Sequence, residues 1–106
     1  REPPVDAGPQ AEALPSTPPV RAEEEIVLLE RAETALTKDP AAALALTQTL
    51  EEAYPRVALV QEREAIAIEA LAKLGRLEEA QARLRRFLSA HPESPHRMRL
   101  ERLAPP

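Results

Sequence analysis

The side chains that could do metal chemistry in this sequence are two histidines near its C-terminal end. His91 and His96 lie five positions apart, with Glu93 between them. Two prolines interrupt the same segment. A metal site needs more ligands than these, held rigidly. We therefore expect two ordinary surface histidines and no bound metal.

Acid-base or nucleophilic catalysis has little support from the residue pattern. Glu62 and Glu69 fall in a predicted helix whose surface is rich in alanine. General acid or base work requires a carboxylate in a dry cleft that shifts its pKa, and such a surface offers no cleft. Ser16, Ser89 and Ser94 have no base and orienting group beside them. We expect a non-catalytic protein without a cofactor; an enzyme that uses Glu62 or Glu69 is a remote alternative.

The stretch from 58 to 92 predicts a helical hairpin. Apolar residues recur at helical spacing in its first half, at Val60, Ala67, Leu71 and Leu74, and Ile66, Ile68 and Ala70 widen this stripe. So wide a stripe predicts a helix packed on two sides. Gly75 favours the left-handed conformation that ends a helix. A second helix follows up to the proline at 92, with apolar residues at Leu77, Ala80, Leu84, Phe87 and Leu88.

The upstream part of the chain predicts a second hairpin of the same kind. Its first helix is expected from Glu23 to Lys38, with three glutamates in its first turn and a broad apolar face made of Ile26, Val27, Leu28, Leu29, Ala32 and Leu36. Asp39 and Pro40 form a capping signal for its second helix. The apolar face of that helix is expected at Ala43, Leu46, Leu50 and Ala53.

The spacing of small residues and prolines agrees between the two hairpins. Ala43 lies 12 residues before Pro55, and Ala80 lies 12 before Pro92. After the second hairpin, a capping serine at 94 with a proline at 95 predicts a short fifth helix containing Met98, Leu100 and Leu103, which would cover the exposed end of the stack. The predicted fold is all-α: two antiparallel helical hairpins plus a short C-terminal capping helix.

Two segments of different composition divide the chain. Residues 1–21 are rich in proline, with six of the 12 prolines in the first twenty positions, and predict an extended linker. Residues 22–104 are rich in Ala, Leu, Glu and Arg and form the predicted helical domain. The domain has two aromatic residues, Tyr54 and Phe87, so its core must be built from aliphatic side chains.

The hairpin pattern resembles the tetratricopeptide repeats. Their second helix carries a small residue, a large apolar one four positions later and a proline at its exit, as do Ala80, Leu84 and Pro92 here. The upstream copy has Thr47 where the large residue is expected, and Ile68 stands where the first helix of the family usually has glycine or alanine. The resemblance covers roughly residues 23–94 and implies stacked hairpins with a concave binding groove.

That resemblance implies a binding surface on the predicted helix before Gly75. By the family's geometry, Glu62, Glu69 and Lys73 would face the concave groove and contact a protein partner. The alternative is a solvated helix face, on which Glu69 and Lys73 form a local pair worth a few tenths of a kcal/mol.

A second candidate surface is basic. Residues 81–106 carry a net charge of +4, against −6 for residues 21–80. The basic residues of this end are Arg83, Arg85, Arg86, Arg97, Arg99 and Arg102. They could bind an acidic protein segment or an anionic surface, with Arg83, Arg85 and Arg86 as the candidate contacts, and the alternative is again a solvated helix face. Nucleic acid is not expected as a partner, because the whole chain has a net charge of −4 and no aromatics interleave with the arginines.

The function predicted from these features is a protein-interaction module of a larger bacterial protein. A structural alternative is an oligomerisation module, whose wide apolar faces pair with a second copy. The chain starts at Arg1 without methionine, so we expect a piece of a longer protein. A proline-rich stretch before an Ala-, Leu- and Arg-rich repeat is similar to the tails of bacterial envelope proteins, including membrane-anchored anti-sigma and sensor proteins. That similarity implies a periplasmic location without membrane insertion of this segment.

Overall fold

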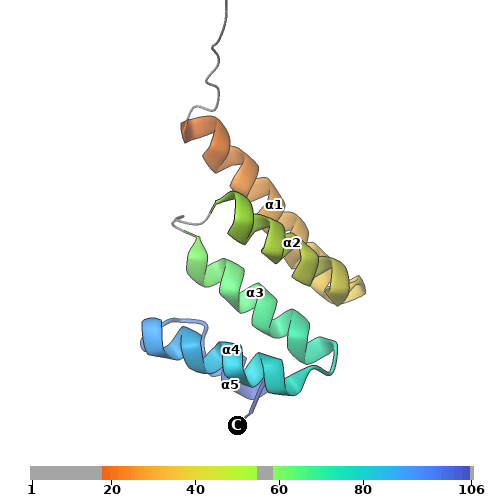
Figure 1. Ribbon diagram of the computed structural model, residues 1–106, viewed down its shortest axis with the longest axis vertical. Helices are drawn as coiled ribbons and strands as arrows, with labels where there is room; N and C mark the ends of the chain where they lie inside the picture. The colour runs from red at the N-terminus through yellow and green to blue at the C-terminus, as the bar shows by residue number, and fades with distance from the viewer. Residues whose placement is uncertain (1–17, 55–58, 106) are drawn as a thin grey trace, which may run out of the picture.

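The computed structural model describes residues 18–54 and 59–105, and these form five α-helices (Figure 1). Their bounds are α1 Pro18–Lys38, α2 Pro40–Ala53, α3 Val60–Lys73, α4 Leu77–Ala90 and α5 Arg97–Leu103. No strand occurs in either described range. Consecutive helices pack against one another from α1 to α5. The predicted all-α fold is therefore confirmed. Residues 1–17, most of the predicted linker, and Pro55, the predicted exit of the second helix, lie outside the described ranges.

Helix α1 ends at Lys38 as predicted but begins at Pro18, five residues before the predicted start. The glutamates at 23–25 are therefore not in its first turn, and their predicted interaction with the positive helix end is wrong. Its buried apolar residues are Leu29, Ala32 and Leu36. Ile26 and Val27 are 46% and 48% exposed, so the predicted face was too broad. The reason is that α1 has neighbours, α2 and α3, on one side only.

Helix α2 begins as its capping signal predicts. Asp39 Oδ1 accepts a hydrogen bond from the Ala42 backbone N–H at 3.1 Å, and Pro40 is the first helical residue. The helix buries Ala43, Leu44, Thr47 and Leu50, whereas Ala53 of the predicted face is exposed. Thr47 fits a core position because its hydroxyl donates to the Leu44 carbonyl at 2.7 Å. A buried hydroxyl satisfied in this way avoids the cost of an unpaired polar group.

Helix α3 is the centre of the molecule, because it packs against all four other helices. It buries Ala65, Ile66, Ala67, Ile68, Ala70 and Leu71, which confirms the prediction of a helix covered on more than one side. Gly75 ends the segment with φ of +79°. The Arg76 N–H donates to the Leu71 carbonyl, and the Gly75 N–H to the Ala72 carbonyl, in the pattern of a Schellman motif.

Helices α4 and α5 close the stack. Helix α4 buries Ala80, Leu84 and Phe87, as predicted. The two leucines beside the turn, Leu74 and Leu77, are 36% and 45% exposed, so the predicted stripe was too long at that end. In α5, Leu100 is fully buried against the stack. Ser94 was predicted to cap this helix, but the helix starts at Arg97 and its N-cap residue is His96. The Ser94 hydroxyl accepts a hydrogen bond from the His96 backbone N–H at 3.2 Å, in the turn before the helix.

The first helix of each hairpin and α5 form one row, because α1 packs on α3 and α3 packs on α5. In Figure 1 this row runs from α1 at the top of the view to α5 at the bottom, where α5 lies behind α4. The two ends of the row are therefore the outer side of α1 and the outer side of α5. Both ends matter for the candidate site below.

Candidate functional site

The three residues predicted to line a groove all lie on α3, and each lies beside a polar or charged side chain of the same chain. Glu69 pairs with Lys73, Oε2 to Nζ 3.8 Å, and also with Arg99 of α5. Glu62 Oε2 lies 3.8 Å from His96 Nε2, just before α5. The carboxylates therefore hold α5 onto α3. Their predicted role in binding a partner stays a prediction.

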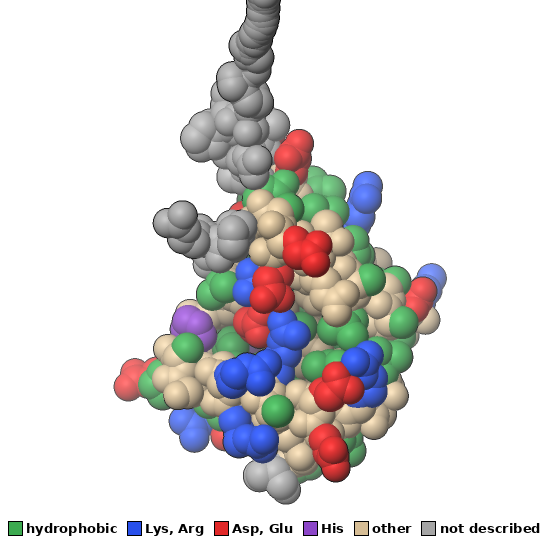
Figure 2. Space-filling view, in the orientation of Figure 1, with side chains coloured by type: hydrophobic (Ala, Val, Ile, Leu, Met, Phe, Trp, Pro, Cys, Tyr) green, Lys and Arg blue, Asp and Glu red, His purple; other side chains and the backbone are tan. Residues whose placement is uncertain are grey.

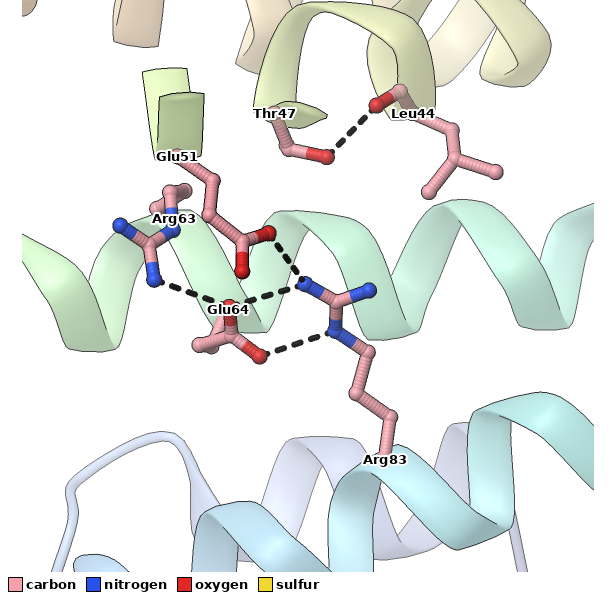
Figure 3. A network of polar contacts seen from close by, with 6 residues as sticks. All are labelled: Leu44, Thr47, Glu51, Arg63, Glu64 and Arg83. Atoms are coloured by element: carbon pink, nitrogen blue, oxygen red, sulfur yellow. Dashed lines mark hydrogen bonds and ion pairs between the residues drawn. The ribbon is translucent and has the colours of Figure 1, made fainter. Parts of the chain in front are cut away.

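Of the three predicted basic residues, Arg83 turns inward. Its guanidinium reaches from α4 to Glu64 on α3 through two hydrogen bonds of 2.9 Å, and to Glu51 on α2 at 3.4 Å (Figure 3). The hydrogen bonds to Glu64 raise the pKa of Arg83 above its usual range. Such bidentate pairs are the strong kind of charged contact. Arg83 is thus a clamp between three helices.

Arg85 and Arg86 differ from Arg83 in exposure and in pairing. Both are exposed, and neither has an ion-pair partner among the residues that the structure describes. Figure 2 shows Lys and Arg side chains gathered over the lower part of this face, where α4 lies. These two arginines remain available to an anionic partner.

Sequence reasoning missed a buried charge on α3. Arg63 is 7% exposed, and its Nη2 donates to Glu64 Oε2 at 3.2 Å. Its Nε and Nη1 are buried without a hydrogen-bond partner. Leaving such donors unpaired costs about 1–3 kcal/mol each. The signal was present: Val60 and Ala67 mark an apolar stripe, and the stripe position between them is filled by the charged pair at 63 and 64.

The carboxylates around Arg63 are shifted in opposite directions. Burial raises the pKa of Glu64, but the hydrogen bonds and charges of Arg83 and Arg63 lower it by more, so the pKa lies below its usual value. On α1, burial raises the pKa of Glu25, and the charge of Arg63 offsets this only in part. The interior thus favours the ionised form of Glu64 and disfavours that of Glu25. Glu64 joins α3 to α4 through Arg83, and Glu25 places a carboxylate of α1 in the field of Arg63 on α3.

The hollow on the outer side of α1 was also missed. We call this side the α1 outer face: Glu23, Glu24, Val27, Leu28, Glu30, Arg31 and Thr34. An open hollow of about 390 Å³, mostly apolar, is lined by Glu23, Glu24, Val27, Leu28, Arg31 and Tyr54. The Tyr54 hydroxyl donates to Glu24 Oε1 at 3.0 Å and fixes one wall. A second shallow hollow continues along Val27, Glu30, Arg31, Thr34 and Ala35.

The opposite end of the row has the reverse character. Met98 of α5 is 70% exposed, and Arg97, Arg99 and Arg102 beside it are exposed too. Arg97 pairs with Glu101 on its own helix at 3.2 Å, and Arg102 has no ion-pair partner in the described part of the chain. We call Met98, Arg99 and Arg102 the α5 end face. It presents a flexible apolar side chain among guanidinium groups.

The two predicted surface histidines are kept apart. His91 caps the C-terminal end of α4 and packs on Phe87, with ring centroids 5.3 Å apart, while His96 faces Glu62. Within residues 18–54 and 59–105, no three His, Cys, Asp or Glu side chains are grouped so that they could hold a metal ion. Over the same ranges, none of the helices has the length and hydropathy needed to cross a membrane.

Comparison with known proteins identified no related protein. No family model matches the sequence, and searches of curated proteins and of solved structures give no significant match. The functional proposal therefore depends on the sequence pattern and on the surface geometry.

Proposed function

We propose that this chain is a non-catalytic protein-interaction module with a tetratricopeptide-like stack, and that its partner docks on the α1 outer face. The observation that carries the proposal is Val27, which is 48% exposed and lines an open, mostly apolar hollow on a helix whose other side is buried. Apolar side chains beside an open hollow favour a docked apolar group over water.

The charges around the hollow indicate what kind of partner fits. The exposed charged residues of α1 with described side chains are four glutamates, Glu23, Glu24, Glu30 and Glu33, against Arg31 and Lys38. A partner that offers an apolar side chain with basic neighbours would complement this face. The predicted groove on α3 is a weaker candidate, since its carboxylates are already paired with α5.

The proposal also covers the larger protein of which this module would be a part. The proline-rich start of the sequence would act as a spacer, and the repeat that follows it would be the binding module at its end. Together they support a module within a larger bacterial protein, such as the extracytoplasmic part of a membrane-anchored regulator. A docking module on a spacer would sample partners at a raised effective concentration.

Site-specific photo-crosslinking tests the docking surface. A photoreactive residue at Val27 samples the hollow, and one at Gln48, exposed on α2, is the matched control. In cells that produce the parent protein, we expect a discrete protein adduct from position 27 and none from position 48. Equal yields at the two positions, or no adduct at 27, would contradict the proposal.

A further inference from the structure

The two ends of the helix row face away from each other and have complementary chemistry. On α1, Leu29 and Ala32 point into the stack, and Val27 and Glu30 lie on the opposite side of the helix. On α5, Leu100 points into the stack, so Met98 and Arg102 lie on its opposite side. Each end is therefore free to meet a surface that continues the row.

The α5 end face has an apolar side chain that could fill the hollow on α1 and positive charges that could pair with its glutamates. Met98 is an exposed, flexible apolar side chain of the kind that adapts to irregular hollows. Arg102 lies one turn further along α5 on the same side as Met98 and has no ion-pair partner among the described residues, just as Glu23 and Glu30 of the α1 outer face have none. Opposite charges with an apolar centre are the pattern of a complementary interface.

We propose that the docking partner of the α1 outer face is a second copy of this chain, joined head to tail. Met98 of one copy enters the hollow beside Val27 of the next, and arginines of the α5 end face lie against glutamates of α1. This inference depends on the docking role proposed above and names its partner. Because the two surfaces differ, the contact is heterologous, and each added copy leaves one free end of each kind.

The interface is small and its charges lie at the rim, so the association is weak and transient. Screening by salt should weaken it further, because exposed ion pairs lose their attraction as the Debye length shortens. Both features give measurable signatures with the full 106-residue chain.

Sedimentation velocity from micromolar to millimolar concentration, with two single variants, tests the arrangement. Val27→Arg places a cation in the hollow, where it repels the arginines of the α5 end face. Met98→Glu places an anion opposite the glutamates of α1. Both positions are exposed, so the fold should be kept, as circular dichroism would verify. Gln48→Arg and Gln48→Glu, on exposed α2 surface, are the matched controls.

For the unchanged chain and both controls, we expect a mean mass that rises with concentration beyond that of a dimer and falls with added salt. Each variant alone should stay monomeric, since no intact head meets an intact tail. An equimolar mixture of the two variants should associate again, because the intact α5 end face of the Val27→Arg chain meets the intact α1 outer face of the Met98→Glu chain.

Three results would overturn head-to-tail pairing. The first is a monomer at all concentrations for the unchanged chain. The second is association that stops at a dimer. The third is an equimolar variant mixture that stays monomeric while the unchanged chain associates. The crosslink at position 27 separates this inference from the docking role: an adduct to a different protein, with a monomeric chain, defeats only the second copy.

Discussion

Helices α1 and α3 open the two hairpins, yet their surroundings differ greatly. Helix α3 packs against every other helix and buries six aliphatic residues together with Arg63. Helix α1 packs on two helices and leaves Ile26 and Val27 in solvent. The comparison shows that the position of a helix in the stack decides which of its apolar residues are buried in the core. At the end of the row, part of an apolar face is left uncovered by the other described helices.

The largest effect that separates the two helices should come from removing apolar side chains. Ile68 on α3 is fully buried, and Ile68→Ala should reduce the free energy of unfolding by about 2–5 kcal/mol through lost burial and a cavity. Val27→Ala on α1 should change it by no more than about 0.5 kcal/mol. Urea unfolding followed by circular dichroism measures both. Equal losses would mean that α1 is covered as fully as α3.

The next effect concerns the clamp between α2, α3 and α4. Arg83→Met keeps the aliphatic stem but leaves Glu64 with Arg63 alone, and should cost about 1.5–3 kcal/mol, the value of hydrogen bonds to charged groups. Arg86→Met is the control on the same helix and should be nearly neutral, because Arg86 is exposed. Matched stabilities of the two variants would show that the clamp contributes nothing.

Substitutions in the turns inside the two hairpins should have a smaller effect on the free energy of unfolding, and the effect should differ between the two turns. Gly75→Ala should cost about 1–2 kcal/mol, because alanine is strained in the left-handed conformation. No atom outside the two adjoining residues lies within 4 Å of the added methyl group, so the cost is one of local backbone strain alone. Asp39→Ala in the first hairpin should cost about 1 kcal/mol, for loss of the cap. Thermal unfolding of both variants checks this order, and a neutral Gly75→Ala would contradict it.

The smallest and most specific effect is a pH dependence of opposite sign on the two helices. The folded pKa of Glu64 lies below its unfolded value, so its stabilisation is present above an unfolded pKa of about 4.3 and is lost as pH falls through the folded pKa. The folded pKa of Glu25 lies above its unfolded value, so its ionisation lowers stability as pH rises through the folded pKa.

Two amide variants measure that contrast. At neutral pH, Glu25→Gln should be more stable than the unchanged chain and Glu64→Gln less stable, and both differences should shrink below a pH of about 4. Urea unfolding at a series of pH values gives the curves. The same sign of change for both variants at neutral pH would refute the opposed pKa shifts.

Local chemistry in the sequence was enough to predict the helices and two of their boundaries, the end of α3 and the start of α2. Gly75 and Asp39 predict the turn and the cap because each acts through its own backbone or side chain. The burial of Arg63 and the exposure of Val27 were missed, because both depend on which helices lie beside them. Periodicity tells which side of a helix is apolar, and packing decides whether that side is covered.

The surroundings of the predicted site residues could not be read from the sequence, for a related reason. Glu62 and Glu69 were chosen as groove residues, but α5 meets them with His96 and Arg99. Arg83 was grouped with Arg85 and Arg86 by sequence proximity, although helical rotation points it inward and leaves the other two in solvent. Partners from distant positions in the chain are set by tertiary structure.

Thiol labelling offers the most direct check of the α1 outer face as a docking surface, because the chain has no cysteine of its own. Val27→Cys and, as the exposed control, Gln48→Cys would be labelled with increasing amounts of the cysteine-free chain present. We expect labelling at position 27 to slow as that chain is added, labelling at 48 to stay constant, and added Met98→Glu chain to protect neither. If both positions keep their labelling rates throughout, the α1 outer face does not bind the α5 end face.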